Sequence, residues 1–352
     1  MIANTKTFYA VGQGGFYSEK IQYERQTYTI VYDCGSVGSK SKLVQAINNS
    51  TLDKVDCIVL SHLDRDHVNG LSDLQNYLKK MSPDNEPLLI LPNPSPLDLL
   101  IFFSNSSDKE MDAYFQLMKN KRILLVTNDR AKEDVVYLDD IRGQTKVSHN
   151  ALFISHKNAE DSCKWQLKLY VEKMKYDGLS RSEQDFIQGI KSIDDFNRKE
   201  KGSNKKNKDR LRAIYKKIPG GMNCSSMAMI SAPYDKDIRV RNSMNENGGP
   251  FVSWMNGDIC LKDKAELVAI EKHFKDYLSL NIDFQIPHHG SKNNFESLPQ
   301  IGGKIRTYIW AGKNNNHGHP DDTVLKKLQK SGVEIKWITE EDEHIVRNEI
   351  WV

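Results

Sequence analysis

Apolar and polar positions alternate through the first 33 residues, around a glycine-rich turn at 12–15. The alternating apolar positions are Phe8, Ala10, Ile21, Tyr23, Ile30 and Tyr32. Because successive side chains of a strand point to opposite faces, this period of two predicts antiparallel strands at the start of the chain.

Beyond residue 33, short apolar runs alternate with stretches of helical spacing. The runs predict strands at 55–60, 227–230, 251–255 and 282–286. The helical spacing predicts helices at 40–48, 67–80, 265–280 and 321–330. Residues 97–220 give mixed signals of helix and strand. The alternation indicates an α/β protein, in which helices pack on the faces of a sheet.

Composition is that of a soluble globular protein. Apolar residues make up 38% of the 352 residues, and the mean hydropathy is -0.60. No run of about 18 apolar residues and no secretory signal is visible, so we expect no membrane contact. The five scattered cysteines predict free thiols and a cytoplasmic protein. Because the motifs below span both halves of the chain, we expect one domain over 1–352, with a poorly recognisable insertion at about 97–220.

The net charge of the chain is only +3, but one segment is strongly basic. Ten Lys and Arg residues lie within 198–217, against only Glu200 and Asp209. Blocks of charge are often disordered, so a solvated insertion loop is the favoured interpretation. A contact with the phosphates of a nucleic acid is the alternative.

A cluster of metal-ligand residue types follows the predicted strand 55–60. His62, Asp64, Asp66 and His67 fall within six residues, just where that strand ends. Backbone that has left a sheet can aim several side chains at one point. Imidazole and carboxylate suit divalent cations of borderline or hard character. The segment therefore predicts a metal site.

Other candidate residues also come at the ends of predicted strands. Asp33, Asp258 and the pair His288 and His289 each stand at such an end. Six of the ten histidines lie in three short segments, at 62, 67, 288, 289, 317 and 319. This clustering favours a shared site over scattered surface histidines. His273, in contrast, lies on the predicted helix 265–280 and is interpreted as structural.

The spacing resembles the signature His-x-His-x-Asp-His of the metallo-β-lactamase superfamily, with Asp64 where the second histidine is commonest. The form with aspartate is similar to the nuclease domain of bacterial competence (DNA-uptake) channel proteins, and phosphorylcholine esterases are a second comparison. Further matching positions are Asp33, Asn223, Asp258 and the segments 288–291 and 317–320. The resemblance implies an α/β four-layer αββα sandwich, with two sheets face to face and helices outside.

The resemblance also implies two bound divalent ions. The implied ligands are His62 and Asp64 for one ion, Asp66 and His67 for the other, Asp258 as a bridge, and His289 completing the second site. Asp33 would support the metal loop from outside. The carboxylates make the set rich in oxygen, so zinc or manganese is expected and magnesium is possible. Other members of the superfamily place a further histidine between the first cluster and the bridging aspartate. Here only His149 and His156 stand in that part of the chain, in no recognisable motif, so an incomplete first site is expected.

A water activated by two ions implies a hydrolase. His288 and His319 favour a phosphodiester, because an imidazolium can neutralise a phosphate oxygen or protonate a leaving group. With Asp66 they are the expected catalytic residues. Ser291 and Asn223 would help to bind substrate, and a role as a turn or cap residue is the equal alternative for each. We expect a nuclease acting on DNA. The alternatives are a small-molecule phosphodiesterase for nucleotide or phosphorylcholine-type substrates, and a catalytically weak metal-binding partner subunit.

Overall fold

The computed structural model describes most of the chain. The described residues are 2–23, 26–93, 118–129, 134–158, 164–172, 179–188, 213–214, 226–234, 251–341 and 344–351. Two features singled out in the sequence, Asn223 and nearly all of the basic segment 198–217, lie outside these residues.

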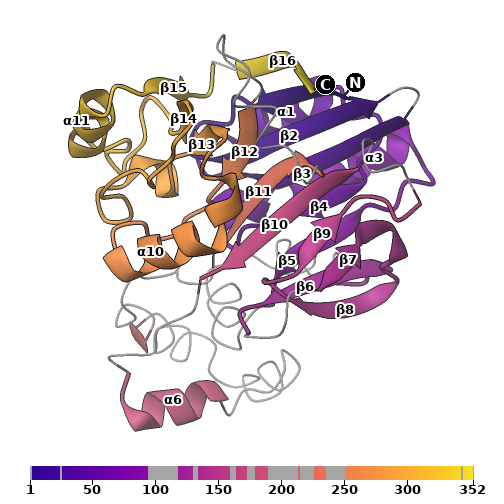
Figure 1. The fold of residues 1–352 in the computed structure, drawn as a ribbon, viewed down its shortest axis with the longest axis horizontal. Coiled ribbons are helices and arrows are strands. Elements are labelled where there is room, and N and C mark those ends of the chain that lie inside the picture. The colour runs from indigo at the N-terminus through magenta and orange to yellow at the C-terminus, as the bar shows by residue number, and fades with distance from the viewer. Residues whose placement is uncertain are drawn as a thin grey trace.

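Two sheets of eight described strands each form the centre of the molecule (Figure 1). The first sheet has the order β16-β1-β2-β3-β4-β5-β6-β8, and the second β15-β14-β13-β12-β11-β10-β9-β7. The strands of the first sheet are β1 (Ile2–Phe8), β2 (Gly14–Tyr23), β3 (Gln26–Ser36), β4 (Cys57–Val59), β5 (Leu88–Pro92), β6 (Arg122–Thr127), β8 (Gly143–Ser148) and β16 (His344–Trp351). Those of the second are β7 (Val135–Tyr137), β9 (Leu152–Ile154), β10 (Trp165–Val171), β11 (Met227–Pro233), β12 (Phe251–Met255), β13 (Asn281–Gln285), β14 (Ile305–Trp310) and β15 (Glu334–Ile338).

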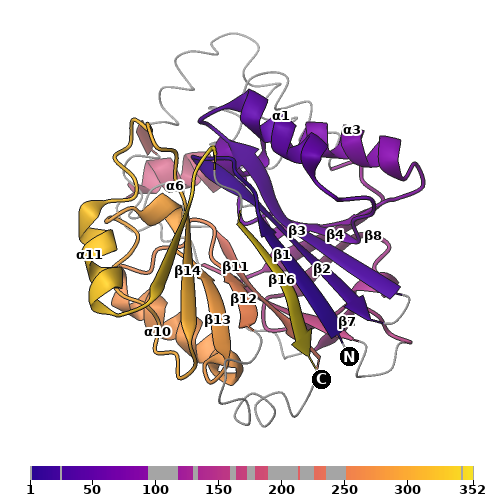
Figure 2. The same cartoon turned by 90° about the horizontal axis from the view of Figure 1, so that it is seen from above.

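Helices cover the outer faces of both sheets (Figure 2). The helices α1 (Lys40–Asn49) and α3 (Leu71–Met81) lie outside the first sheet, and α10 (Lys264–His273) and α11 (Asp322–Lys330) lie outside the second. Each turns a stripe of apolar side chains inward, such as Val324 and Leu328 of α11, which removes that stripe from water. The arrangement confirms the predicted αββα sandwich. Among the described helices, none is both long enough and apolar enough to cross a membrane.

The inner faces of the two sheets are joined by buried aromatic contacts. The rings of Phe8 on β1 and Tyr308 on β14 stack with their centroids 3.8 Å apart. The hydroxyl of Tyr32 on β3 donates to the carbonyl of Met227 on β11 at 2.6 Å. Because buried contacts join the sheets at two separate pairs of strands, the sheets cannot slide without breaking them.

A buried ionic group also joins the sheets. The ammonium of Lys6 on β1 lies 2.7 Å from Oδ2 of Asp283 on β13, and both side chains are fully buried. The guanidinium of Arg306 on β14 donates two hydrogen bonds to the same carboxylate, at 2.6 and 2.8 Å. One carboxylate therefore serves two cations from different sheets.

Each sheet contains a parallel half. In the first sheet β3, β4, β5, β6 and β8 run parallel, and in the second β12, β13, β14 and β15 do. Parallel strands end at the same edge of their sheet, which is where binding residues collect in α/β proteins. The segments that follow β4, β12, β13 and β14 hold most of the candidate residues.

Several predicted elements differ in extent from the observed ones. The helix expected at 67–80 is two helices, α2 (Arg65–Val68) and α3, because the N–H of Gly70 donates to the carbonyl of Cys34 and breaks the run. The helix expected at 265–280 ends at His273 and continues as a 3-10 turn, Lys275–Tyr277. Within 97–220, the described part supplies β6, β7, β8, β9, β10 and the helix α6 (Arg181–Gln188), so this region extends both sheets.

Candidate metal centre

The candidate ligands come from both sheets and meet at their carboxyl edges. His62 follows β4, and His67 lies on the short helix α2 just beyond it. Asp258 lies in the turn after β12, and His289 lies in a 3-10 turn, His288–Gly290, after β13. The sandwich thus brings together residues that are far apart in the sequence, such as Asp66 and His289, which are separated by 223 positions.

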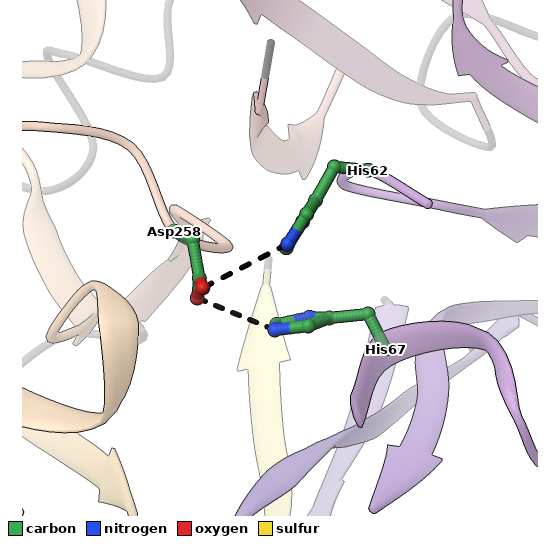
Figure 3. A group of neighbouring side chains, drawn as sticks. All are labelled: His62, His67 and Asp258. Atoms are coloured by element: carbon green, nitrogen blue, oxygen red, sulfur yellow. Dashed lines mark ion pairs between the residues drawn. The ribbon is translucent and has the colours of Figure 1, made fainter. Parts of the chain in front are cut away.

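The first ligand group is His62, His67 and Asp258 (Figure 3). Nε2 of His67 lies 3.3 Å from Oδ1 of Asp258, and Nε2 of His62 lies 3.7 Å from Oδ2 of the same carboxylate. All three side chains are buried. Figure 3 shows both imidazoles pointing at the carboxylate from the opposite sheet, so each of its oxygens faces a different ring.

The second ligand group is Asp66, His67 and His289. Nε2 of His289 lies 2.9 Å from Oδ2 of Asp66, and Nε2 of His67 lies 3.9 Å from that oxygen. In each group one ligand atom per residue lies within 4.8 Å of the others. His67 belongs to both groups, so the two candidate positions for an ion are adjacent.

Three inward atoms of the first group lack hydrogen-bond partners among the described residues. They are Nε2 of His62, Nε2 of His67 and Oδ1 of Asp258, each buried. A buried polar atom without a partner loses its hydration and gains nothing in return, so such atoms are rare in proteins. Here two nitrogens and an oxygen converge, which is a suitable donor set for a divalent cation. The residues present therefore fit the metal that the sequence predicted.

Hydrogen bonds outside the ligand groups fix the orientation of the rings. Oδ2 of Asp33 lies 2.8 Å from Nδ1 of His67, so Nε2 of that ring faces inward. The N–H and the hydroxyl of Ser61 both donate to Asp33, each at 2.7 Å. The same hydroxyl lies 2.9 Å from Nδ1 of His62. Such partners of metal-binding histidines set the tautomer and the basicity of the ring. Asp33 thus contacts His67 from outside the ligand groups, and Ser61 lies beside it.

The second sheet supports its histidines in the same way. Nδ1 of His289 lies 2.8 Å from the carbonyl oxygen of Trp310, and Nδ1 of His288 lies 2.7 Å from Oδ1 of Asn294. His288 and His289 have positive φ angles of 47° and 55°. This conformation is costly for residues other than glycine and is typical of functional sites. The motif sequence gave no indication of Asn294 or of the Trp310 carbonyl.

The buried imidazoles and carboxylates of the centre shift the pKa values of one another. Burial would lower the pKa of His67, but the carboxylates around it, Asp258 first, hold that pKa well above its usual value. Burial would raise the pKa of Asp258, but the imidazoles around it, His288 first, hold that pKa well below its usual value. These surroundings favour a proton on His67, with which a cation would compete, so the affinity for a cation should fall as the pH is lowered.

Two further imidazoles stand beside the ligand groups. Nε2 of His288 lies 3.7 Å from Oδ2 of Asp258. The ring of His319, in the segment after β14, lies 5.7 Å from that of His288. The buried Nδ1 of His319 has no hydrogen-bond partner among the described residues. Burial, and then the neighbouring His288, lowers the pKa of His319 to about 4, so this ring is neutral at pH 7 in the free protein.

The remaining predicted residues lie in different surroundings. Oδ2 of Asp64 lies 3.7 Å from Nε2 of His62, outside both ligand groups. Asp64 is the N-cap residue of α2, yet its side chain makes no capping hydrogen bond and so stays available as a ligand. The hydroxyl of Ser291 accepts the N–H of Asn293 at 3.2 Å, which is a turn contact.

Neither earlier histidine joins the two ligand groups. Nδ1 of His149 lies 3.2 Å from the N–H of Val171, and Nδ1 of His156 lies 3.8 Å from a carboxylate oxygen of Asp139. His273 contacts the carbonyl of Leu169 through Nε2 at 2.8 Å, a structural contact as expected. Asn223, a predicted substrate residue, lies outside the described residues.

We expect the substitution Asp33→Asn to weaken metal binding. The amide keeps the shape of the side chain but cannot accept from His67 and from both donors of Ser61. Changes to such partners typically lower metal affinity about 10- to 100-fold. Competition with a chelator measures the effect. The matched control is Asp56→Asn, since Oδ2 of Asp56 accepts the N–H of Thr29 at 2.8 Å, away from both ligand groups. Equal affinity in both variants would contradict the supporting role of Asp33.

Comparison with known proteins bears on the metal segment first. The model of the Metallo-beta-lactamase superfamily matches residues 21–82, which include Asp33 and the segment from His62 to His67. This match supports the superfamily assignment made from the motifs. No curated protein sequence matches the chain.

Two solved structures are similar to the chain at low sequence identity. The crystal structure of unliganded yeast PDE1 is 9% identical, with a TM-score of 0.44, over 96% of this chain and 98% of that one. A long form RNase Z from yeast is 12% identical, with a TM-score of 0.32, over 88% of this chain and 41% of that one.

Proposed function

We propose that the protein is a metal-dependent phosphodiester hydrolase, and that DNA is its favoured substrate. The observation that carries the proposal is the pair of ligand groups that share His67. In the first group, the inward atoms of His62, His67 and Asp258 make no hydrogen bond among the described residues. Two additional imidazoles, His288 and His319, stand beside these groups. A site that only held a structural metal would have no need of them. The similarity to competence-channel nucleases and the cytoplasmic location remain predictions.

The donor set favours two divalent ions. His62, with Asp258, would hold one ion, and Asp66 with His289 the other, while His67 lies between them. Asp64, whose Oδ2 lies 3.7 Å from Nε2 of His62, would be an additional oxygen donor for the first ion. Several carboxylates alongside imidazoles suit zinc or manganese, and also admit magnesium. When bound, such ions supply a water of lowered pKa and neutralise charge on a phosphate.

The chain itself would provide orientation and a proton. His288 is held by Asn294 so that its Nε2 faces the centre. Because its Nδ1–H donates to Asn294, the ring can donate from Nε2 to a phosphate oxygen only as an imidazolium. His319 is neutral in the free protein, because burial and the nearby imidazoles lower its pKa. An anionic phosphodiester beside the ring would raise that pKa by favouring the charged form. His319 would then carry a proton mainly when substrate is bound, and could pass it to the leaving oxygen.

A substrate panel tests the proposal. Purified protein, first stripped with a chelator, is assayed with circular and linear DNA, RNA, cyclic nucleotides and bis(p-nitrophenyl) phosphate, each with Mn²⁺, Mg²⁺ or Zn²⁺ in turn. We expect metal-dependent cleavage of DNA and of the nitrophenyl diester. Cleavage of small diesters alone would replace DNA by a small-molecule substrate. Absence of cleavage by metal-loaded protein on every substrate would overturn the proposal.

The substitution His319→Ala should separate leaving-group chemistry from the rest of the reaction. A poor leaving group, such as the sugar oxygen of DNA, needs a proton, whereas nitrophenolate does not. Because general acid catalysis contributes about 10²- to 10⁴-fold, we expect a loss of that order on DNA. The rate on the nitrophenyl diester should change little. The reference variant is His317→Ala, whose exposed ring lies 6.0 Å from that of His319. Equal losses on both substrates for His319→Ala would remove it from the proton-donor role.

A further inference from the structure

The segment that carries His319 is attached to the end of β15. We call residues 311–320, between β14 and α11, the His319 loop. The indole N–H of Trp337 donates to the carbonyl of Ala311 at 2.7 Å. The N–H of Lys313 donates to Oε2 of Glu340 at 3.1 Å. Both contacts hold the first residues of the loop.

Inside the loop, one side chain fixes its shape. Oδ1 of Asn315 accepts the N–H groups of His317 and His319, each at 3.0 Å, and its Nδ2 donates to the carbonyl of Gly312 at 2.7 Å. The loop is therefore a compact unit, so a shift of its first residues would be passed on to His319.

The carboxylate of Glu340 lies in a niche lined by glycines from three separate segments. A Cβ atom at Gly12 would stand 2.7 Å from Cδ of Glu340, and one at Gly312 would overlap Oε1. A Cβ at Gly38 would lie 3.6 Å from the same oxygen. Gly12 also has a φ of 66°, a conformation that glycine adopts at little cost. A side chain at Gly12 or Gly312 would collide with this carboxylate, whereas one at Gly38 would only touch it.

The segments at Gly12 and Gly38 also connect to α2, the helix that bears Asp66 and His67, which we call the metal helix. Next to Gly38, the hydroxyl of Ser36 donates to the carbonyl of Val11 at 2.7 Å, which ties the two segments together. Ser36 then forms a pair of backbone hydrogen bonds with the side chain of Asn69, at 3.0 and 2.7 Å. Asn69 is the C-cap residue of α2, two positions after His67. A continuous set of contacts thus leads from Glu340 to the helix that bears Asp66 and His67.

We propose that Glu340 is a positioning residue, which fixes the His319 loop against the segments that hold the metal helix. It would set the distance between His319 and the metal centre without touching the substrate. Its effect on the reaction rests on the proposed function, in which His319 donates the proton. The physical reason is that catalysis needs the donor within hydrogen-bond reach, and a displacement of about 1 Å can cost about 10²-fold in rate.

Three substitutions test this role. Glu340→Ala empties the niche, whereas Glu340→Gln keeps the shape and an oxygen that can accept from Lys313. Glu341→Ala is the matched control, because this neighbouring carboxylate contacts only the exposed ammonium of Lys313 among the described residues, at 2.7 Å. We expect Glu340→Ala to lower the rate on DNA by about 10²-fold and to change the nitrophenyl diester rate little. Glu340→Gln and Glu341→Ala should both behave nearly as the wild type.

Hydrogen exchange gives a readout that does not depend on activity. In Glu340→Ala, amides of the His319 loop should exchange faster, while those of β3 and β13 keep their protection. As a single substitution, Gly312→Ala should also speed exchange in the His319 loop, because the added Cβ would overlap the carboxylate of Glu340. In the Glu340→Ala background that overlap is gone, so Gly312→Ala should add little.

The two readouts separate the possible failures. Faster exchange in the His319 loop, together with a wild type that cleaves no phosphodiester, would support the positioning role and overturn the proposed function. Unchanged exchange in Glu340→Ala would overturn the positioning role, whatever the activity. Equal rate losses on DNA and on the nitrophenyl diester would also overturn it, because a general structural defect acts on both substrates.

Discussion

The substitution Asp258→Asn should abolish hydrolysis and reduce the metal content of a protein that remains folded. Each oxygen of this carboxylate faces a different imidazole, and an amide would offer one acceptor and no charge. Changes outside the ligand set already lower metal affinity about 10- to 100-fold, so a larger loss is expected here. Steady-state rates and elemental analysis of the dialysed protein measure both effects.

The fold should survive because the side chain of Asp258 supports the chain little. Oδ1 has no hydrogen-bond partner among the described residues, and the main chain is held separately, with the carbonyl accepting from Asn294 at 3.1 Å. Metal at 100 times its Kd should stabilise the wild type by about 2.7 kcal/mol, and this gain should disappear in the variant. The control is Asp53→Asn, an exposed partner of Lys20. Wild-type turnover by a homogeneous Asp258→Asn protein would refute the ligand role.

The residues of the two ligand groups could be singled out in the sequence because their signal is local. Four candidates lie within six residues after one strand, and Asp258 and His289 follow directly on other strands. The ends of parallel strands meet at one edge, so residues far apart in the sequence can be assigned to one site. The sheet order could not be read in this way, because pairing depends on which strands meet in three dimensions. For the same reason 97–220 gave no clear signal of strands in both sheets.

The supporting residues could not be predicted, because they depend on contacts between distant segments. Nothing in the sequence near Asn294 or Glu340 marks them, since their partners lie at His288 and in the N-terminal turn at Gly12. The pKa of His319 is a similar case. A histidine in a motif is expected to titrate near neutrality, yet burial lowers this pKa to about 4. Only the packed structure gives the protonation state on which its role depends.

The substitution Asp283→Asn should lower the free energy of unfolding more than any surface change, although it lies outside the metal centre. The carboxylate is fully buried and serves both Lys6 and Arg306. Removing one partner of a buried ionic group typically costs about 3–5 kcal/mol, because the remaining charge stays out of water. The matched control is Asp53→Asn, which breaks the exposed pair with Lys20 and should lower the free energy of unfolding by only about 0–1 kcal/mol. Denaturation in urea measures both variants.

The free energy of unfolding should differ between the wild type and Asp283→Asn, and the pH dependence of that difference identifies its cause. Burial would raise the pKa of Asp283, but Lys6 and Arg306 outweigh it and lower that pKa below its usual value. A carboxyl group with a lowered pKa stabilises the folded state above its unfolded pKa, about 3.9, and loses this contribution as the pH falls through the folded value. The gap between wild type and Asp283→Asn should therefore be constant near neutrality and shrink below about pH 4. A gap that stayed the same at every pH would mean that the variant loses packing between the sheets, and that the charge of Asp283 contributes nothing.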